Sequence, residues 1–134
     1  LADDSGLEVH YLNGEPGVYS SRYAGPNATY HDNCTQLLLN LRGVPFRRRA
    51  ARFRCVLVFI APNNIRIMAE GLLKGVIIES PRGSNGFGYD PIFLPEGHSK
   101  TLAEMGAAEK NSLSHRAVAV QSIKPHLISY FQLR

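Results

Sequence analysis

The chain has 134 residues, enough for one domain, and its 44% hydrophobic and 19% charged residues are typical of a globular protein. No apolar run approaches the roughly 20 residues that a membrane-spanning helix needs, so we expect no membrane partner. Two cysteines without metal-ligand or disulfide spacing favour a reducing cytoplasm, and a net charge of +4 favours an anionic partner. We therefore expect residues 1–134 to form a single cytoplasmic domain.

The first half of the chain predicts two strands and a helix. Residues 1–12 begin inside a strand, and the sequence NGEPG that follows has turn chemistry. Thr29 can cap a helix that runs to about Leu41. Residues 52–60 alternate between apolar side chains on one face and arginine or valine on the other, which predicts a strand with one buried face.

The second half continues the alternation of strands and helices. Residues 65–78 predict a further strand that glycines interrupt, at Gly71 and Gly75. After a glycine-rich loop, residues 91–94 predict a short strand. Thr101 and Glu104 then form a capping box that opens a short helix.

The end of the chain predicts a long helix. Ser114 can cap it, and it should run to about Phe131, with Pro125 kinking it or ending its first half. Taken together, the elements predict an α/β fold.

The stretch NGFGYDPIF, residues 85–93, places an aromatic side chain between two glycines. Gly86 and Gly88 free the backbone for close approach and positive φ, so Phe87 should be held on a loop. One interpretation is a tight turn whose phenylalanine fills the core. The other is a pocket wall, in which a flat ring stacks on a flat ligand and Asp90 lies at its edge.

Asp3 and Asp4 are adjacent at one end of a strand, which should put one carboxylate on each side of the pleat. One of them can then reach a hard cation, and Mg²⁺ prefers a carboxylate or two together with substrate phosphates. The alternative is an ordinary acidic turn that ends at Gly6.

Lys110 lies near the end of one predicted helix, and Ser114, His115 and Arg116 lie at the start of the next. Free amides at a helix start suit an anion or an electron-rich oxygen, and the histidine and arginine add donors there. The alternative is that this histidine–arginine pair is exposed and has no ligand.

The five arginines at positions 47–49, 52 and 54 form a basic cluster. Its simplest interpretation is a solvated loop that runs into a strand face. A nucleic-acid groove is the alternative, but no aromatic residues alternate with these arginines in the sequence.

A family resemblance connects these motifs. The sequences ADDSGLEV, GEPGVYSSRYAG, RFRCVLVF, PRGSNGFGYDPIF, TLAE and EKNSLSHRA occur in this order across nearly the whole chain. Together they resemble the XTP/dITP diphosphohydrolases, the inosine triphosphate pyrophosphatase family. The resemblance implies a curved mixed β-sheet flanked by helices. It also implies a cytoplasmic homodimer that hydrolyses XTP, ITP and dITP to the monophosphate and pyrophosphate with Mg²⁺.

The resemblance also assigns roles to individual residues. Asp4 matches the proton acceptor and metal-associated aspartate, and Asp3 is a weaker candidate for the metal shell. The substrate contacts that it implies are Ser5, the base loop Phe87, Gly88, Tyr89 and Asp90, and the later residues Lys110, His115 and Arg116.

The chain departs from the family pattern at its start. The family begins with a strand and a Ser/Thr-x-Asn-x-x-Lys loop that binds the triphosphate, and neither precedes ADDSG here. We therefore expect the chain to be N-terminally incomplete and poorly active by itself. Two alternatives are a purine-nucleotide-binding fragment without catalysis and a basic nucleic-acid-binding module, although we expect no nucleic-acid partner.

Overall fold

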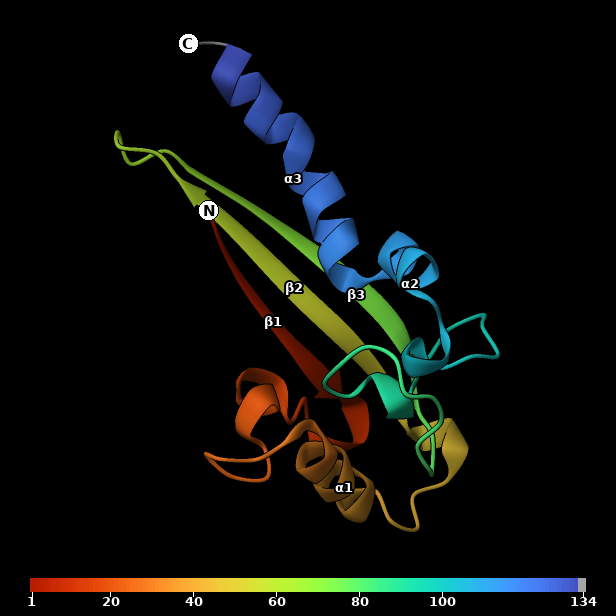
Figure 1. Ribbon diagram of the computed structural model, residues 1–134. Coiled ribbons are helices and arrows are strands. Elements are labelled where there is room, and N and C mark those ends of the chain that lie inside the picture. The colour runs from red at the N-terminus through yellow and green to blue at the C-terminus, as the bar shows by residue number, and fades with distance from the viewer. Residues whose placement is uncertain (133–134) are drawn as a thin grey trace.

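The computed structural model describes residues 1–132, which form one antiparallel sheet with helices packed against it (Figure 1). The strands are β1 (Ala2–Val9), β2 (Ala50–Ile60), β3 (Arg66–Ile77) and β4 (Phe93–Pro95), in the order β1-β2-β3-β4. The helices are α1 (Tyr30–Asn40), α2 (Ala107–Leu113) and α3 (His115–Gln132). Within these residues no helix combines the length and the apolar character needed to cross a membrane.

The expected mixed sheet is wrong for the described residues, because every strand pair within residues 1–132 is antiparallel. A short turn joins β2 to β3, and such a turn allows only antiparallel pairing. The connection through α1 returns to the same end of the sheet, so β2 begins beside the end of β1, with Val9 paired to Ala51.

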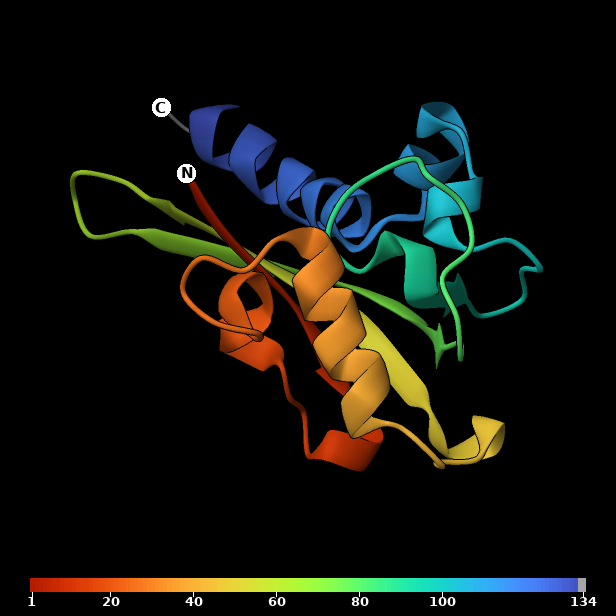
Figure 2. The ribbon, with the colours of Figure 1, turned by 60° about the horizontal axis from the view of Figure 1, so that its bottom comes forward.

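The side-chain alternation predicted for β2 is confirmed. Phe53, Cys55 and Leu57 are buried on the inner face of the sheet. At one end, Leu37 of α1 and Leu41, directly after that helix, share a core cluster with Phe53. At the other end, α3 packs on Cys55 and Leu57. Figures 1 and 2 show α3 along the sheet near the tip of the β2–β3 hairpin and α1 near the opposite end.

Strand β3 is continuous, so the expected interruption at its glycines is wrong. Both glycines instead allow close approach. A Cβ atom at Gly71 would lie 2.0 Å from the His115 carbonyl oxygen and 2.4 Å from the Ala119 nitrogen. A Cβ atom at Gly75 would lie 2.7 Å from the ring of Phe93. Because glycine has no side chain, the backbone of α3 and the Phe93 ring of β4 can lie directly against β3 at these two positions.

The predicted cap of α1 is present: the Thr29 hydroxyl accepts from the Asp32 amide at 3.1 Å, and the Asp32 carboxylate accepts from the Thr29 amide at 2.9 Å. In α3, the Ser114 hydroxyl accepts from the Ala117 amide at 3.2 Å. Pro125 does not end this helix, which continues to Gln132. Pro125 and the residue one turn before it are exposed, so water can bind the carbonyl that proline leaves free.

We predict that Gly71→Ala lowers the free energy of unfolding by about 2 kcal/mol or more, because the new methyl group would meet backbone atoms that cannot rotate away. Chemical denaturation measures this loss. Gly106→Ala is the control, because a Cβ atom there would have no neighbour within 4 Å. Alanine is less favourable than glycine at this helix N-cap, but it also restricts the unfolded chain more than glycine does. The two effects on the free energy of unfolding should cancel to within about 1 kcal/mol. Equal effects of the two variants would contradict the close-approach role of Gly71.

Candidate functional site

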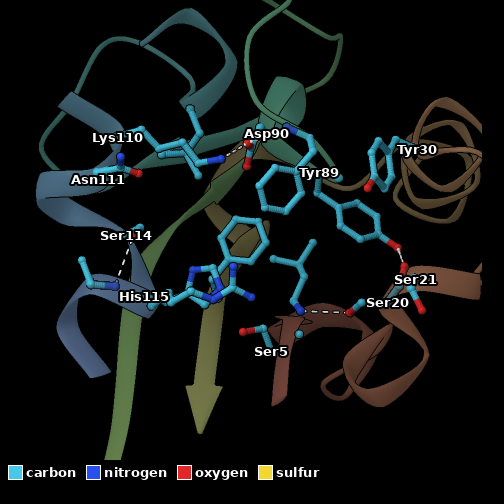
Figure 3. Close-up of a pocket in the computed structure, with 18 of the residues that line it drawn as sticks. Ser5, Ser20, Ser21, Tyr30, Tyr89, Asp90, Lys110, Asn111, Ser114 and His115 are labelled. Atoms are coloured by element: carbon cyan, nitrogen blue, oxygen red, sulfur yellow. Dashed lines mark hydrogen bonds and ion pairs between the residues drawn. The ribbon is translucent and has the colours of Figure 1, made fainter. Parts of the chain in front are cut away.

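A cavity of about 630 Å³ opens between α1 and the junction of α2 with α3 (Figure 3). Tyr30 and Tyr89 lie on one side in this view, and Lys110 and His115 lie on the other. The cavity brings together the predicted site residues other than Asp4 and the weaker candidate Asp3, namely Ser5, Phe87, Gly88, Tyr89, Asp90, Lys110, His115 and Arg116.

The aromatic loop, residues 83–90, has the backbone that its glycines predict. Gly86 and Gly88 have φ values of 76° and 60°, in the left-handed region. Phe87 is 54% exposed, so the interpretation that it fills the core is wrong. Tyr89 is buried in its place, and its hydroxyl donates to the Ser20 carbonyl at 2.6 Å. Burial raises the pKa of Tyr89, so this hydroxyl stays protonated and acts as a structural donor.

The Asp90 side chain fixes the loop from within. It is only 4% exposed, and its Oδ2 accepts from the Phe87 amide at 3.0 Å and from the Lys110 ammonium at 2.5 Å. A Cβ atom at Gly86 would lie 2.2 Å from the same oxygen, so only glycine fits there. The Lys110 Nζ also lies 4.2 Å from the centre of the Phe87 ring, a cation–π contact. The loop and α2 are therefore joined by one buried charge pair.

His115 contributes a neutral imidazole to the cavity. Its ring stacks on Phe53, with centroids 5.0 Å apart and an angle of 16° between the planes. Burial, together with the nearby positive charges of Arg116 and Lys110, lowers the pKa of His115 to about 4. Neutral imidazole offers one donor and one acceptor, and its Nδ1 is buried without a partner among the described residues.

The hydroxyl of Ser5 is also buried without a hydrogen-bond partner in the described part of the chain. Native proteins rarely leave buried polar groups unpaired, so such groups beside a cavity are natural contacts for a ligand. Arg116 lies nearer the surface, where its Nε pairs with Asp3 Oδ2 at 3.0 Å and both side chains are about half exposed. This pair holds Asp3 on the cavity side of β1.

Asp4 lies apart from the cavity, on the opposite face of β1. The structure thus confirms that the adjacent aspartates point to different sides of the sheet, with Asp3 opposite Leu57 and Asp4 opposite Val56. Asp4 lines a small hollow of about 70 Å³ with Val18 and Arg54. This hollow and the large cavity share two residues of β1, Ser5 and Gly6.

The residues present fit a magnesium ion only in part. No group of three or more His, Cys, Asp or Glu side chains clusters within residues 1–132. Mg²⁺ needs fewer, because one or two carboxylates with substrate phosphates and water suffice. Since Asp3 and Asp4 occupy opposite faces, one ion at the edge of β1 could bind only one of them directly.

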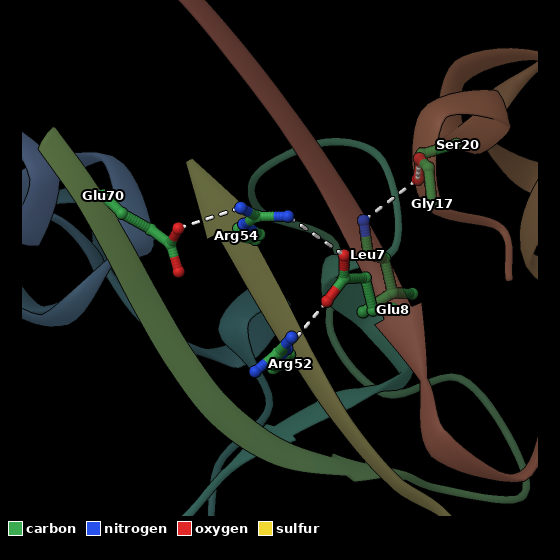
Figure 4. Close-up of polar contacts among 7 residues, drawn as sticks. All are labelled: Leu7, Glu8, Gly17, Ser20, Arg52, Arg54 and Glu70. Carbon is green, nitrogen blue, oxygen red and sulfur yellow. Dashed lines mark hydrogen bonds and ion pairs between the residues drawn. The ribbon is translucent and has the colours of Figure 1, made fainter. Parts of the chain in front are cut away.

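The predicted basic cluster divides into three parts. Arg49 is 2% exposed, and it donates to the carbonyls of Ile77 at 2.7 Å and Leu41 at 2.8 Å, so its role is structural. Arg52 and Arg54 lie on the outer face of the sheet (Figure 4). There they pair with Glu8 at 2.7 Å and Glu70 at 2.9 Å. The arginines at positions 47 and 48 make no ion pair with residues 1–132, and Arg48 instead lies 6.0 Å from the centre of the Tyr11 ring.

Several cavity residues were not among the predicted site residues: Ser20, Ser21, Tyr30, Phe53, Asn111 and Gln121. The sequence contained a signal that could have indicated Phe53, because the alternation of β2 placed this residue on the inner face of the sheet. Tyr30 had none, because it is the first residue of α1 and belongs to no apolar stripe.

The Ham1 family model matches residues 1–126 of the chain. The chain belongs to the Ham1 family. Among curated relatives, a dITP/XTP pyrophosphatase of a Thermoanaerobacter species is 48% identical over 96% of this chain and 64% of the relative. A dITP/XTP pyrophosphatase of Shouchella clausii is 51% identical over 92% of this chain and 63% of the relative.

Solved structures of Ham1 proteins agree with the fold. The Staphylococcus aureus Ham1 protein superposes with a TM-score of 0.92 at 41% identity, over 96% of this chain and 66% of that protein. A HAM1 protein of Coxiella burnetii superposes with a TM-score of 0.89 at 42% identity, over the same shares. The chain therefore spans a little under two thirds of the curated relatives that it matches.

The buried histidine should make the stability of the domain depend on pH. Because its pKa is about 4 when folded and near 6.5 when unfolded, the unfolded chain binds more protons between these values. The free energy of unfolding should therefore fall as pH falls through this window, by at most about 1.4 kcal/mol per pH unit. His115→Phe keeps the stack on Phe53, so we predict a shallower fall by chemical denaturation. His126→Gln, at an exposed position, should keep the slope of the parent. Equal slopes for the parent and His115→Phe would show that His115 is not buried in its neutral form.

Proposed function

We propose that the protein hydrolyses non-standard purine nucleoside triphosphates (ITP, dITP and XTP) to the monophosphate and pyrophosphate. The observation that carries this proposal is the cavity itself, where an exposed ring, a buried charge pair and unpaired polar atoms line one space. The names of the relatives, dITP/XTP pyrophosphatases, supply the substrate class.

The base would bind on the ring of Phe87. An aromatic ring stacks on any purine, so it gives affinity with little selectivity. Selectivity has to come from hydrogen bonds at the base edge. Inosine and xanthosine carry an accepting oxygen at C6, where adenosine carries a donating amino group. Arg116 has only donors, and neutral His115 can present one, so both suit the oxygen at C6. Against Arg116 the amino group of adenine would meet donor with donor.

The phosphates would extend over the edge of β1, where the large cavity meets the hollow beside Asp4. In this arrangement Asp4 takes a proton from the water that attacks the α-phosphorus, and the bond to the bridging oxygen breaks to release pyrophosphate. Asp4 would also hold the magnesium ion, with Asp3 as the weaker candidate. When bound, Mg²⁺ neutralises part of the phosphate charge, and reactions at phosphorus depend largely on this neutralisation.

The remaining parts of the proposal concern setting and assembly. We place the enzyme in the cytoplasm, where the nucleotide pool is, and expect it to act as a homodimer with Mg²⁺. Its substrates are small anions, which agrees with the net charge of +4.

A second candidate function is purine-nucleotide binding without catalysis. It is favoured by the uneven distribution of the predicted site residues: eight of them line the large cavity, whereas the hollow proposed for the phosphates holds Asp4 and shares only Ser5 with the cavity. Binding of ITP without release of pyrophosphate by the natural full-length protein would establish this alternative.

The test of the proposed function is pyrophosphate release from ITP and ATP by the natural full-length protein with Mg²⁺. We predict a preference for ITP that reaches up to about 10⁴-fold, because the amino group of adenine would face donors of the site instead of an acceptor. Asp4→Asn keeps the shape of the side chain but cannot accept a proton, so the rate should fall by about 10²- to 10⁴-fold.

Glu70→Gln is the matched control, because Glu70 lies in the same cross-strand row as Asp4, with Val56 between them, and on the same face. It should stay within about threefold of the parent, since it only loses a surface ion pair with Arg54. Equal rates with ITP and ATP would contradict the substrate class. An Asp4→Asn variant as active as the control would remove Asp4 from its role.

A further inference from the structure

Tyr30 is the first residue of α1, and no motif in the sequence drew attention to it. It lines the cavity, the residue is 59% exposed, and Figure 3 shows its ring on the same side as Tyr89. Its ring centre lies 6.2 Å from that of Phe87, with 46° between the planes. Aromatic pairs at such distances and tilts attract each other by about 0.5–1.5 kcal/mol beyond the area that they bury.

Phe87 needs such support, because its neighbours in the chain provide little. Glycines on both sides leave the backbone free to turn, and the ring is half exposed. The backbone of the loop is fixed by Asp90 at the Phe87 amide. The ring itself makes a cation–π contact with Lys110 at 4.2 Å and a ring–ring contact with Tyr30.

Helix α1 contacts this loop at two positions one turn apart. Residues four apart lie on the same face of a helix, and here they are Tyr30 and Cys34. The Cys34 thiol donates to the Gly88 carbonyl at 3.3 Å, while Tyr30 meets the ring of Phe87. Burial raises the pKa of Cys34 to about 11, so the thiol keeps the proton that this hydrogen bond needs. The first turns of α1 therefore support both the backbone and the ring of the loop.

The distance between the two rings decides how Tyr30 can act. A base between two parallel rings needs two stacking distances, about 7–8 Å in total. The rings of Tyr30 and Phe87 are closer than that and steeply tilted, so a purine does not fit between them. Tyr30 must therefore act through Phe87.

We propose that Tyr30 is a positioning residue for purine recognition, which holds the ring of Phe87 in the orientation that stacks on the base. This inference rests on the proposed nucleotide site and adds a residue to it from a helix that carries none of the predicted contacts. The ring of Tyr30 is sufficient for this role and its hydroxyl is dispensable, because the contact with Phe87 is between the two rings.

The test is a double-mutant cycle on the 134-residue chain, with inosine 5′-monophosphate as the probe and calorimetry as the measurement. Tyr30→Ala should weaken binding by roughly 3- to 10-fold, the worth of one aromatic pair, and Tyr30→Phe should restore it. In a Phe87→Ala background, Tyr30→Ala should cause no further loss, because the ring that it positions is gone.

Two controls separate positioning from a structural effect. Tyr19→Ala removes a similarly exposed tyrosine, stacked with Arg22 outside the cavity, and should leave binding unchanged. Tyr30→Ala keeps the capping box of Thr29 and Asp32, so the helical circular dichroism should match the parent.

The outcomes distinguish the positioning role of Tyr30 from the nucleotide site on which that role rests. If the parent binds the probe and Tyr30→Ala binds equally well, or if its loss simply adds to that of Phe87→Ala, the positioning role is wrong while the nucleotide site stands. If the parent does not bind the probe at all, the proposed nucleotide site fails, and the role of Tyr30 fails with it.

Discussion

The arrangement of the site depends on one buried carboxylate. Asp90 is almost fully enclosed, and the same oxygen accepts from the amide of Phe87 and from the ammonium of Lys110. Removing one partner of a buried charge pair is costly, because the other charge stays buried and uncompensated. The pair therefore fixes the aromatic loop against α2. Since α2 leads within two residues into α3, it also sets where His115 and Arg116 lie.

The polar groups of the two faces of the sheet have different roles. On the inner face, Ser5 and His115 keep unpaired polar atoms beside a cavity, which is costly unless a ligand uses them. On the outer face, Arg54 Nε is also buried without a hydrogen-bond partner among the described residues, but the charges of Arg52 and Arg54 are paired with Glu8 and Glu70. Little free positive charge therefore remains there for a nucleic acid. This difference favours a small-molecule site on the inner face over the basic-module alternative.

Local sequence rules predicted much of the fold, because caps, alternation and turn residues act over a few residues. The cap at Thr29, the buried face of β2 and the loop position of Phe87 were all predicted from neighbouring residues. The continuity of β3 was not, because the reason for Gly71 is the backbone of α3, which lies far away in the chain. The parallel component expected of the sheet was also absent from the described residues.

The same distinction explains which parts of the candidate site could be predicted. Motif residues such as Lys110 and Asp90 were identified, but their ion pair joins residues 20 apart and has no local signal. Tyr30 reaches the cavity only because α1 packs beside the aromatic loop. Asp4 shows the opposite limit: the pleat correctly separated it from Asp3, but the sequence did not indicate which of the two lies on the inner face of the sheet.

The most direct measurement of the central claim, that the cavity on the inner face binds a purine nucleotide, is an amide chemical-shift map of the chain titrated with inosine 5′-monophosphate. The account predicts saturable shifts at Ser5, at residues 86–90 and at Lys110, His115 and Arg116, which surround one cavity. Shifts confined to Tyr11, Arg47 and Arg48, which line a separate hollow, would contradict it. The absence of any saturable shift would contradict it equally.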